Sequence, residues 1–310
     1  MEYIKKFHLK NKIFKWVTQS ASSIVLLIVL AIFVVLIYES RLAIKEFGVI
    51  HFITSTDWDP YRNLFGAAHV LFGTLFITFF ALLYAIPLSI GIAIFIAEVV
   101  PGKLKQIINT SIEMLAAIPS IIYGMWGLFV LAPIMAEYVE PFLQKTLGTV
   151  PGIKIFFEGT PIGIDMFTAS IILSIMIIPF IATVTREAFD QVPSVLKESA
   201  YGMAATRWEV IKDILIPFIK RNILGGIVLA FGRALGETMA VAFVLGNNHK
   251  ISFSLLDATA TITVTLANEF TEADGDLYLS SLFYLGLILF VLSFALLSLA
   301  KYFILRRKEA

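Results

Sequence analysis

The interval REAFDQVPSVLKESAYGMAATRWEVIKDILIPF, residues 186–218, stands between two long apolar runs and carries charges of both signs. Its first half predicts a short helix. Ser194 directly follows Pro193, and serine is a favoured N-cap because its hydroxyl accepts a hydrogen bond from an early helical N–H group. We expect this helix to run to about Met203.

The second half of the interval predicts another helix start. Thr206 and Glu209 have the spacing of a capping box, in which the hydroxyl and the carboxylate satisfy free N–H groups reciprocally. Pro217 has no N–H group, so we expect this second helix to stop there, after Ile216. The pattern therefore predicts two short helices joined at Ala204–Ala205.

The first of these helices has one side of small and apolar residues. This side is too small to form a domain core, but it is large enough to fill a groove on a partner protein. A helix that lies on the lipid surface has the same pattern, and the spacing alone leaves both interpretations open. The residues of this side are Val195, Leu196, Ser199, Ala200 and Met203.

Outside this interval the chain is strongly apolar. Of its 310 residues, 58% are hydrophobic and 15% are charged, there is no cysteine, and the mean hydropathy is +0.87. Six runs approach the roughly 20 residues that cross a bilayer, so we predict an all-α polytopic membrane protein with six transmembrane helices. The predicted spans are Ser20–Tyr38, His69–Ala97, Ile112–Pro133, Pro161–Val184, Asn222–Gly246 and Leu277–Ile304.

The basic residues predict the orientation of these spans. Seventeen Lys and Arg residues lie in the termini and in the segments on the same side as residues 186–221, six lie on the other side, and Arg233 lies within a span. Because Lys and Arg are enriched in cytoplasmic segments, we expect both termini in the cytoplasm and the protein in the cytoplasmic (inner) membrane.

Four divisions of the chain follow from the predicted spans. They are an N-terminal cytoplasmic segment (1–19), a first span with its outer loop (20–68), a core of five spans (69–304) and a cytoplasmic tail (305–310). The last outer loop gathers four acidic residues, a pattern that suits either the docking of an external partner or simple solvation. These residues are Glu269, Glu272, Asp274 and Asp276.

The fifth predicted span contains two opposite charges. The stretch AFGRALGETMAVAFVLGN, residues 230–247, holds Arg233 and Glu237 four residues apart. A charge costs about 2.5–3.5 kcal/mol at a span centre, whereas an i,i+4 pair returns only about 0.2–0.5 kcal/mol. We therefore expect both charges to face protein or water, either along a path for an anion or in a structural ion pair with another subunit. Beside them runs a stripe of small residues for close helix contact, made of Gly232, Gly236 and Ala240.

The 186–218 interval resembles the coupling loop of ABC-importer permeases. Residues 198–200 (ESA) and 214–217 (ILIP) fit the pattern E-A-A-x3-G-x9-I-x-L-P, and the departures from it are Ser199, Ala204 and Ile216. The resemblance implies a cytoplasmic coupling helix, between the fourth and fifth spans, that docks an ATP-hydrolysing subunit. The coupling residues that it implies are Glu198, Ala200, Gly202 and Ala204.

Further segments resemble the phosphate-importing permeases (PstC-type) of the binding-protein-dependent transport family. They are DWDP (57–60), FGAAHVLFGTL (65–75), LAAIPSIIYGMWGLFVLAP (115–133) and ALGETMAVAFVLGN (234–247). The resemblance implies the type I ABC-importer permease fold and ATP-driven phosphate import, without a cofactor and without nucleic acid. The partners that it implies are a sister permease (PstA-like), ATP-binding subunits (PstB-like), an extracytoplasmic phosphate-binding protein (PstS-like) and inorganic phosphate. We expect the translocation path to include Arg233, Glu237 and Thr238.

Two other functions stay open beside this one. The cargo of an ABC importer of this kind could be another oxyanion, such as molybdate or sulfate. A secondary anion transporter could use Arg233 and Glu237 for substrate and proton, although it would need no coupling loop. The chain contains no G-x4-G-K-[ST] motif to cradle ATP phosphates, so we expect no enzymatic activity and ATP hydrolysis by a separate subunit.

Overall fold

The structure is a computed structural model that describes residues 2–306, with the side chains of residues 11–302. Six of its helical stretches are long and apolar enough to cross a membrane, as the sequence predicted. They are Asn11–Phe47, Ala68–Val99, Ser120–Thr146, Met166–Asp190, Arg207–Leu235 and Asp276–Tyr302. Within the described residues, the only strands are two short ones that pair antiparallel, β1 (Trp58–Asp59) and β2 (Leu64–Phe65).

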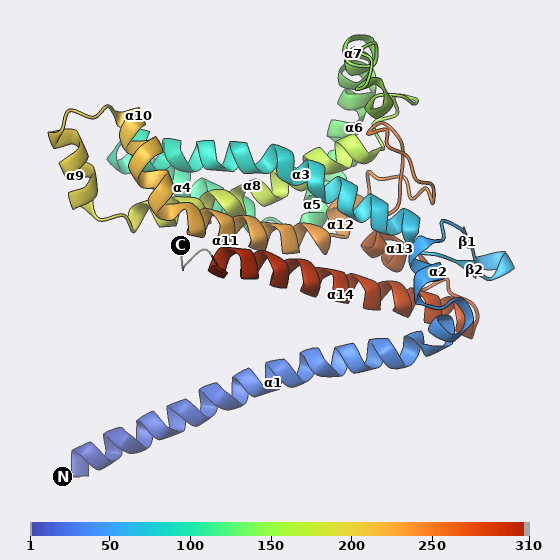
Figure 1. Ribbon diagram of the computed structural model, residues 1–310, viewed down its shortest axis with the longest axis horizontal. Helices are drawn as coiled ribbons and strands as arrows, with labels where there is room; N and C mark the ends of the chain where they lie inside the picture. The colour runs from blue at the N-terminus through green and yellow to red at the C-terminus, as the bar shows by residue number, and fades with distance from the viewer. Residues whose placement is uncertain (1, 307–310) are drawn as a thin grey trace.

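The bundle is built around two long helices, α3 (Ala68–Ile94) and α8 (Met166–Asp190), which pack along their length with α11 (Ile216–Leu235) beside them (Figure 1). Their shared core is almost entirely apolar and includes Ile77, Ile172 and Ile177. The shorter helices complete the bundle: α2 (Val49–Thr54), α4 (Gly102–Ala116), α5 (Ser120–Trp126), α6 (Ala132–Ile134), α7 (Glu140–Thr146), α9 (Ser194–Gly202), α10 (Arg207–Glu209), α12 (Met239–Ala242) and α13 (Ile262–Glu269).

The first and last long helices pair with each other over only part of their length. In α1 (Glu2–Phe47), residues 11–32 are exposed, and contact with α14 (Asp276–Arg306) begins near Phe33, whose ring stacks on Phe290 at 5.4 Å. Towards its N-terminus α1 diverges from the rest of the bundle (Figure 1). From Ile24 to Ile32 this exposed stretch is apolar on all sides, as expected of a helix surrounded by lipid or by another subunit.

Three prolines enter helices after a widened turn, whereas Pro87 and Pro179 lie inside α3 and α8. Three π-helical segments, Gly127–Leu131, Met135–Val139 and Val210–Leu215, are each followed by a helix with proline in its first turn, at Pro133, Pro141 and Pro217. Proline lacks an N–H group and its ring clashes with the carbonyl four residues earlier. A π turn shifts the hydrogen-bond register by one residue, so the chain passes each proline without leaving the helical path.

Because of these π turns, two of the predicted helix ends are wrong. The third span continues past Pro133 to Thr146, and the helix that begins at the Thr206 cap continues past Pro217 to Leu235. The predicted start of the third span is also wrong. Residues 112–116 belong to α4, and the chain breaks before Pro119 because the residue preceding a proline disfavours the helical conformation.

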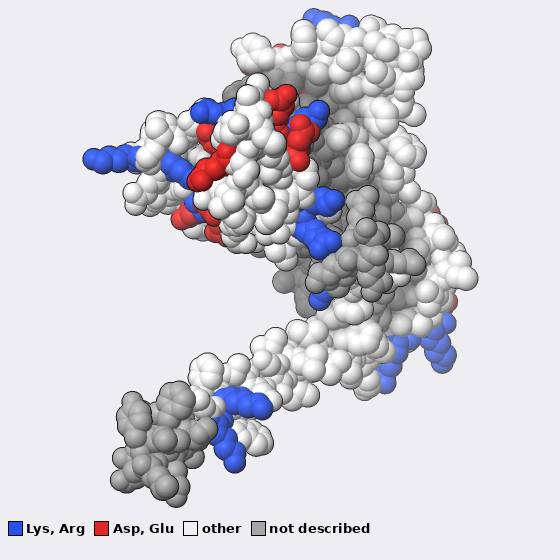
Figure 2. All heavy atoms as spheres, turned by 60° about the vertical axis from the view of Figure 1, so that its left-hand side comes forward, with Lys and Arg blue, Asp and Glu red and all other residues white. Residues whose placement is uncertain are grey.

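The bundle has two distinct ends. Helix α9 lies at one end, called the α9 end, and the β1–β2 hairpin lies at the other, called the hairpin end (Figure 1). Figure 2 shows charged side chains of both signs gathered at the α9 end, against flanks that are largely uncharged. This distribution fits a bundle whose flanks face lipid or other subunits and whose ends face water.

Candidate functional site

The loop at the α9 end is a helix–turn–helix fixed by backbone hydrogen bonds. Helix α9 begins directly after Pro193, and no side chain caps it, so Ser194 is its first residue rather than its N-cap. At its other end Ala204 N–H donates to Tyr201 O at 3.0 Å, and Ala205 N–H donates to Ala200 O at 3.1 Å. These two bonds are those of a Schellman motif, which requires a left-handed residue just past the helix.

Ala204 is that left-handed residue, with φ 62°. It is also the position at which the family pattern has glycine, which adopts this conformation without strain. The predicted joint at Ala204–Ala205 is therefore correct, and alanine there is strained. Next to it the predicted capping box is present: Thr206 N–H donates to Glu209 Oε2 at 2.7 Å, and Glu209 N–H donates to Thr206 Oγ1 at 3.4 Å.

Helix α9 places its small face on the chain itself. Ala200 is buried and packs in a cluster with residues from α3, α8 and the helix that follows, including Phe189, Val210 and Leu215. The expected apolar side is therefore divided, because Ala200 faces inward while Val195 and Met203 face outward. Glu198 and Gly202 are also exposed. The large apolar residues exposed around α9 are Val195, Leu196, Tyr201, Met203 and Trp208.

One ion pair ties α9 to the second span. Lys197 Nζ lies 2.6 Å from Glu98 Oε1, and the Glu98 side chain is only 9% exposed. Glu98 belongs to the π-helical last turn of that span, Phe95–Val99. Because a partly buried ion pair is screened less than a surface pair, α9 and the second span are held together at this point.

The fifth span breaks where the sequence predicted a continuous helix. Helix α11 ends at Leu235, Gly236 and Glu237 lie outside regular structure, and α12 begins after Thr238. The prediction of one helix over 222–246 is therefore wrong. Two of the freed backbone groups bind side chains: Thr263 Oγ1 donates to Glu237 O at 2.7 Å, and Ala240 N–H donates to Glu237 Oε1 at 3.1 Å.

This break changes how Arg233 and Glu237 relate to each other. Arg233 lies in the last turn of α11, where a cation interacts favourably with the helix C-terminus, and its side chain is exposed. Glu237 is half-buried and caps α12. In the part of the chain that the structure describes, no ion pair joins the two side chains. They flank an unwound segment rather than forming one turn of a helix.

The predicted stripe of small residues is split by the same break. Gly232 packs against Leu297 of α14, while Ala240 lies in α12 and packs against α5. At that second contact a Cβ on Gly124 would lie 2.7 Å from Met239 O, so a glycine is required there. Close packing is thus present at both ends of the stripe, but on different neighbours.

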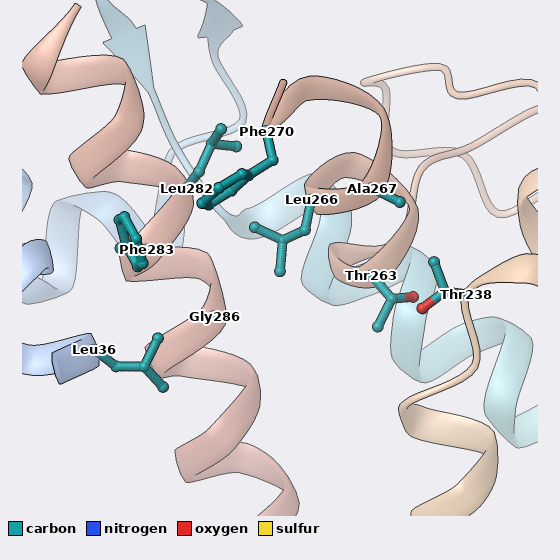
Figure 3. A pocket seen from close by; sticks show the side chains of 9 residues that line it. All are labelled: Leu36, Thr238, Thr263, Leu266, Ala267, Phe270, Leu282, Phe283 and Gly286. Atoms are coloured by element: carbon teal, nitrogen blue, oxygen red, sulfur yellow. The ribbon is translucent and has the colours of Figure 1, made fainter. Parts of the chain in front are cut away.

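A cavity of about 410 Å³ lies beside the break, between α13, α14 and α1. Its walls are almost entirely apolar, and Figure 3 shows the side chains of Thr238 and Thr263 pointing toward each other at one end. Arg233 and Glu237 do not line it. Because an apolar cavity does not stabilise an anion, this cavity is not suited to hold one.

The hairpin end contains a polar network that the sequence analysis did not find. Glu269 accepts hydrogen bonds from Trp58 Nε1 at 2.8 Å and from the Tyr278 hydroxyl at 2.7 Å, and His249 Nε2 lies 3.2 Å from its other oxygen. His249 Nδ1 in turn lies 2.9 Å from Nε2 of the buried His69. The two histidines are 180 residues apart in sequence, so no local spacing signals their contact.

Charge at this end is also arranged differently from the predicted acidic cluster. Glu269 is buried in the network, whereas Glu272, Asp274 and Asp276 are exposed. Burial acts to raise the pKa of Glu269, but hydrogen bonds from His249, Tyr278 and Trp58 outweigh burial and lower it. The carboxylate is therefore held in its charged form as a structural acceptor.

Comparisons with known proteins agree with this architecture. A family model described as the binding-protein-dependent transport system inner membrane component matches residues 85–309. The phosphate transport system permease protein PstC of Mesorhizobium japonicum is 48% identical over 98% of this chain and 92% of its own length. PstC of Haemophilus influenzae is 45% identical, with 96% and 94% covered. A probable PstC of Methanocaldococcus jannaschii is 35% identical, with 99% and 97% covered.

Two solved structures share the fold at low sequence identity. One is an inward-facing form of the MetNI methionine ABC transporter, with a TM-score of 0.56, 15% identity, and 80% of this chain and 98% of that chain covered. The other is a bacterial ABC transporter that imports alginate, with a TM-score of 0.58, 19% identity, and 87% and 88% covered. With six spans and the short helix α9 between the fourth and fifth, the chain has the fold of an ABC-importer permease and belongs to the family of binding-protein-dependent transport system inner membrane components.

Proposed function

We propose that this chain is the transmembrane permease subunit of an ATP-driven phosphate importer. The observation that carries this proposal is the 48% identity, over nearly the whole chain, to a protein named as a phosphate transport permease. The proposed partners are a sister permease (PstA-like), ATP-binding subunits (PstB-like) and an extracytoplasmic phosphate-binding protein (PstS-like). ATP is hydrolysed by the separate subunits, and this chain contributes half of the translocation path.

The proposal includes an orientation in the cytoplasmic (inner) membrane, with both termini and the α9 end in the cytoplasm. The bias of Lys and Arg supports it. Because the chain has no cysteine, single cysteines report the orientation cleanly. Ser199→Cys at the α9 end and Thr56→Cys at the hairpin end are both exposed. We expect an impermeant thiol reagent added outside to label Thr56→Cys alone; labelling of Ser199→Cys instead reverses the orientation.

The coupling surface that we propose is the exposed apolar patch around α9. Val195, Tyr201, Met203 and Trp208 present large side chains to solvent, and contiguous exposed apolar residues mark interaction sites. Ala200 acts beneath this patch by packing. Ala204 is exposed and shapes the turn, and Glu198 and Gly202 are exposed beside it. Met203→Arg is expected to abolish phosphate-stimulated ATP hydrolysis in an assembled complex, because a charge replaces an apolar contact in the docked interface.

The translocation path that we propose runs beside the break in the fifth span, with Arg233, Glu237 and Thr238 along it. Unwound backbone at membrane depth is tolerated where it is buried in protein or lines a water-filled cavity. The exposed guanidinium of Arg233 offers charge-assisted hydrogen bonds to an oxyanion. The C-terminal end of α11 and the Glu237 carboxylate limit that attraction, as a conduit requires in order to release what it binds.

The test compares variants that preserve the local structure. In Glu237→Gln the amide oxygen still accepts from Ala240 N–H, so the cap of α12 remains and only the charge is lost. Arg233→Gln removes the cation, and Arg233→Lys retains it. The matched control is Lys220→Gln, which removes an exposed cation elsewhere on α11. We expect phosphate uptake per assembled complex to fall at least tenfold in Arg233→Gln and Glu237→Gln, and less in Arg233→Lys.

Other outcomes of the same assays separate the alternatives. If uptake falls only in proportion to the amount of complex, the two charges are a structural pair with the sister subunit and the path proposal is wrong. ATP hydrolysis stimulated by sulfate or molybdate, but not by phosphate, identifies another oxyanion as the cargo. Uptake that persists without any ATPase subunit identifies a secondary transporter, which the family membership disfavours.

A further inference from the structure

The β1–β2 hairpin ends in a tip that is exposed and rich in interface-type side chains. Tyr61 is fully exposed (100%), the Arg62 side chain is 79% exposed, and Leu64 is 44% exposed. In Figure 1 the hairpin projects at the end of the bundle opposite α9. Tyr and Arg are the residues most often found as energetic anchors of protein interfaces, so the tip has the composition of a docking element.

The tip is ordered by its own side chains. Asp59 Oδ1 accepts hydrogen bonds from Tyr61 N–H at 3.0 Å and from Arg62 N–H at 3.2 Å. Arg62 Nε also lies 3.5 Å from Asp59 Oδ2, and Asn63 takes a left-handed conformation with φ 53°, which asparagine tolerates. Because the backbone is fixed before any partner arrives, little entropy is lost on docking.

The base of the hairpin is fixed to the bundle. Phe65 is buried and stacks on Tyr278 at 5.2 Å, and Trp58 packs edge-on against Phe65 at 5.1 Å. A Cβ on Gly66 would lie 2.4 Å from Ser55 O, so the two ends of the hairpin approach closely. The Trp58 indole N–H then binds Glu269, the last residue of α13. A force on the tip is therefore passed to α13.

The other end of α13 is attached to the candidate path. Thr263, in its first turn, donates to the Glu237 carbonyl at 2.7 Å, and Ile262 N–H donates to Thr74 Oγ1 of α3 at 3.0 Å. One helix of eight residues thus holds the hairpin at one end and the break in the fifth span at the other. A short helix moves as a rigid unit, so displacement of Glu269 displaces Thr263.

We propose that the hairpin tip, Tyr61, Arg62 and Leu64, is a docking contact for the extracytoplasmic phosphate-binding protein, and that α13 passes its arrival to the backbone at Glu237. This inference rests on the proposed function, which supplies the partner and places the hairpin end outside. A chain of contacts alone does not demonstrate coupling. The two parts of the proposal therefore need variants that separate docking from transmission.

The docking part is tested with the assembled complex in lipid nanodiscs and the purified, phosphate-loaded binding protein. Tyr61→Ala and Arg62→Ala are expected to raise the concentration of binding protein that half-saturates ATP hydrolysis by about tenfold or more, while the maximal rate is retained at saturation. The matched control is Lys154→Ala. Like Arg62, Lys154 is an exposed basic residue of an outer segment with an ion pair at 3.5 Å. It is expected to leave the half-saturating concentration unchanged.

The transmission part is tested with Trp58→Phe and Thr263→Val. Trp58→Phe removes one donor to Glu269 but leaves those from Tyr278 and His249, and Thr263→Val removes the bond to the Glu237 carbonyl. Both are expected to lower the maximal stimulated rate at least fivefold while the half-saturating concentration stays within twofold of the native value. Melting of each purified complex is measured beside the rates, so that loss of fold is not taken for loss of transmission.

The outcomes distinguish this inference from the proposed function. If the native complex shows no hydrolysis stimulated by phosphate-loaded binding protein, the proposed function fails. If the native complex is stimulated and Tyr61→Ala or Arg62→Ala leaves the half-saturating concentration unchanged, docking at the tip is refuted. If Trp58→Phe and Thr263→Val shift the half-saturating concentration instead of the maximal rate, α13 does not transmit the arrival of the binding protein. The same conclusion follows if these variants change neither quantity.

Discussion

The two ends of the molecule are held together by different kinds of contact. At the α9 end, small apolar residues such as Ala200 and Val210 pack against each other, and most of them lie close together in sequence. At the hairpin end, three residues that are far apart in sequence, Trp58, His249 and Tyr278, contact Glu269 through their ring N–H and hydroxyl groups. At the α9 end, single substitutions can therefore change the packed face or the exposed face separately. At the hairpin end, Glu269 both stabilises the fold and attaches the hairpin to α13.

The sharpest test of this difference is Ala200→Arg. Ala200 is 2% exposed within the chain's own cluster, so arginine there buries an unpaired charge or expels α9. We expect a loss of about 3–5 kcal/mol in the free energy of unfolding, seen as a poor yield of complex and rapid proteolysis within residues 191–210. The control is the exposed neighbour Ser199→Arg, which is expected to assemble normally. A stable Ala200→Arg complex would contradict the packing of α9 described above.

The second prediction concerns the ion pair that joins α9 to the second span. Lys197→Met leaves Glu98, with 9% of its side chain exposed, without its cation. We expect the free energy of unfolding to fall by about 2–3 kcal/mol. This is less than for a fully buried ion pair, because the Lys197 side chain is 27% exposed. Glu98→Gln in the same background should recover most of it. A double-mutant cycle on melting of the purified complex measures the pair, and additive effects would show that the contact contributes nothing.

The two ends also differ in how far they could be predicted from the sequence. The α9 loop was predictable because its determinants are local: the capping box of Thr206 and Glu209 and the turn at Ala204 involve residues within a few positions of each other. The helix ends at Pro133 and Pro217 were mispredicted because a π turn, which has no clear sequence signature, absorbs each proline. The break after Leu235 was hidden for another reason: Thr263, 26 residues later, satisfies the carbonyl that the break frees.

The hairpin-end network was the part that could least be predicted from the sequence. Tyr278, His249 and Trp58 carry no shared motif, and their convergence on Glu269 depends on how α3, α13 and α14 pack. The candidate path was found only in part. Arg233 and Glu237 stood out as charges in an apolar run, but their arrangement as flanks of an unwound segment required the structure. Long-range pairing of this kind is set by tertiary packing and leaves no periodicity in the chain.

The third prediction weakens the hairpin end by one hydrogen bond. Tyr278→Phe removes one of the donors that hold Glu269, and we expect a loss of about 1.5 kcal/mol, as for a hydrogen bond to a charged group. The pKa of Glu269 is lowered from 4.5, so this stabilisation is present above that pH and is lost as the pH falls through the folded-state pKa. The difference in melting temperature between native and Tyr278→Phe complexes should therefore shrink below pH 4.5. A difference that stays constant with pH would show that the ring, rather than the charged hydrogen bond, is responsible.

The smallest expected effect is a gain, and it returns to the α9 end. Ala204 holds a left-handed conformation, φ 62°, which costs a residue with a Cβ roughly 1–2 kcal/mol. Glycine avoids that strain but adds freedom to the unfolded chain, so Ala204→Gly should raise the free energy of unfolding by about 0.5–1 kcal/mol. Ala205→Gly is the matched control, because Ala205 has no positive φ and packs against the buried cluster, and it should lower stability by a similar amount. Melting of both complexes measures the difference in sign, and two losses would refute the strained turn.

Phosphate uptake by the stabilised variant then decides what the strain does. Strain held at a site that must move can be part of its mechanism. If Ala204→Gly melts higher and transports more slowly, the turn uses its strain to move α9 during coupling; if uptake is unchanged, the alanine is only a tolerated departure from glycine.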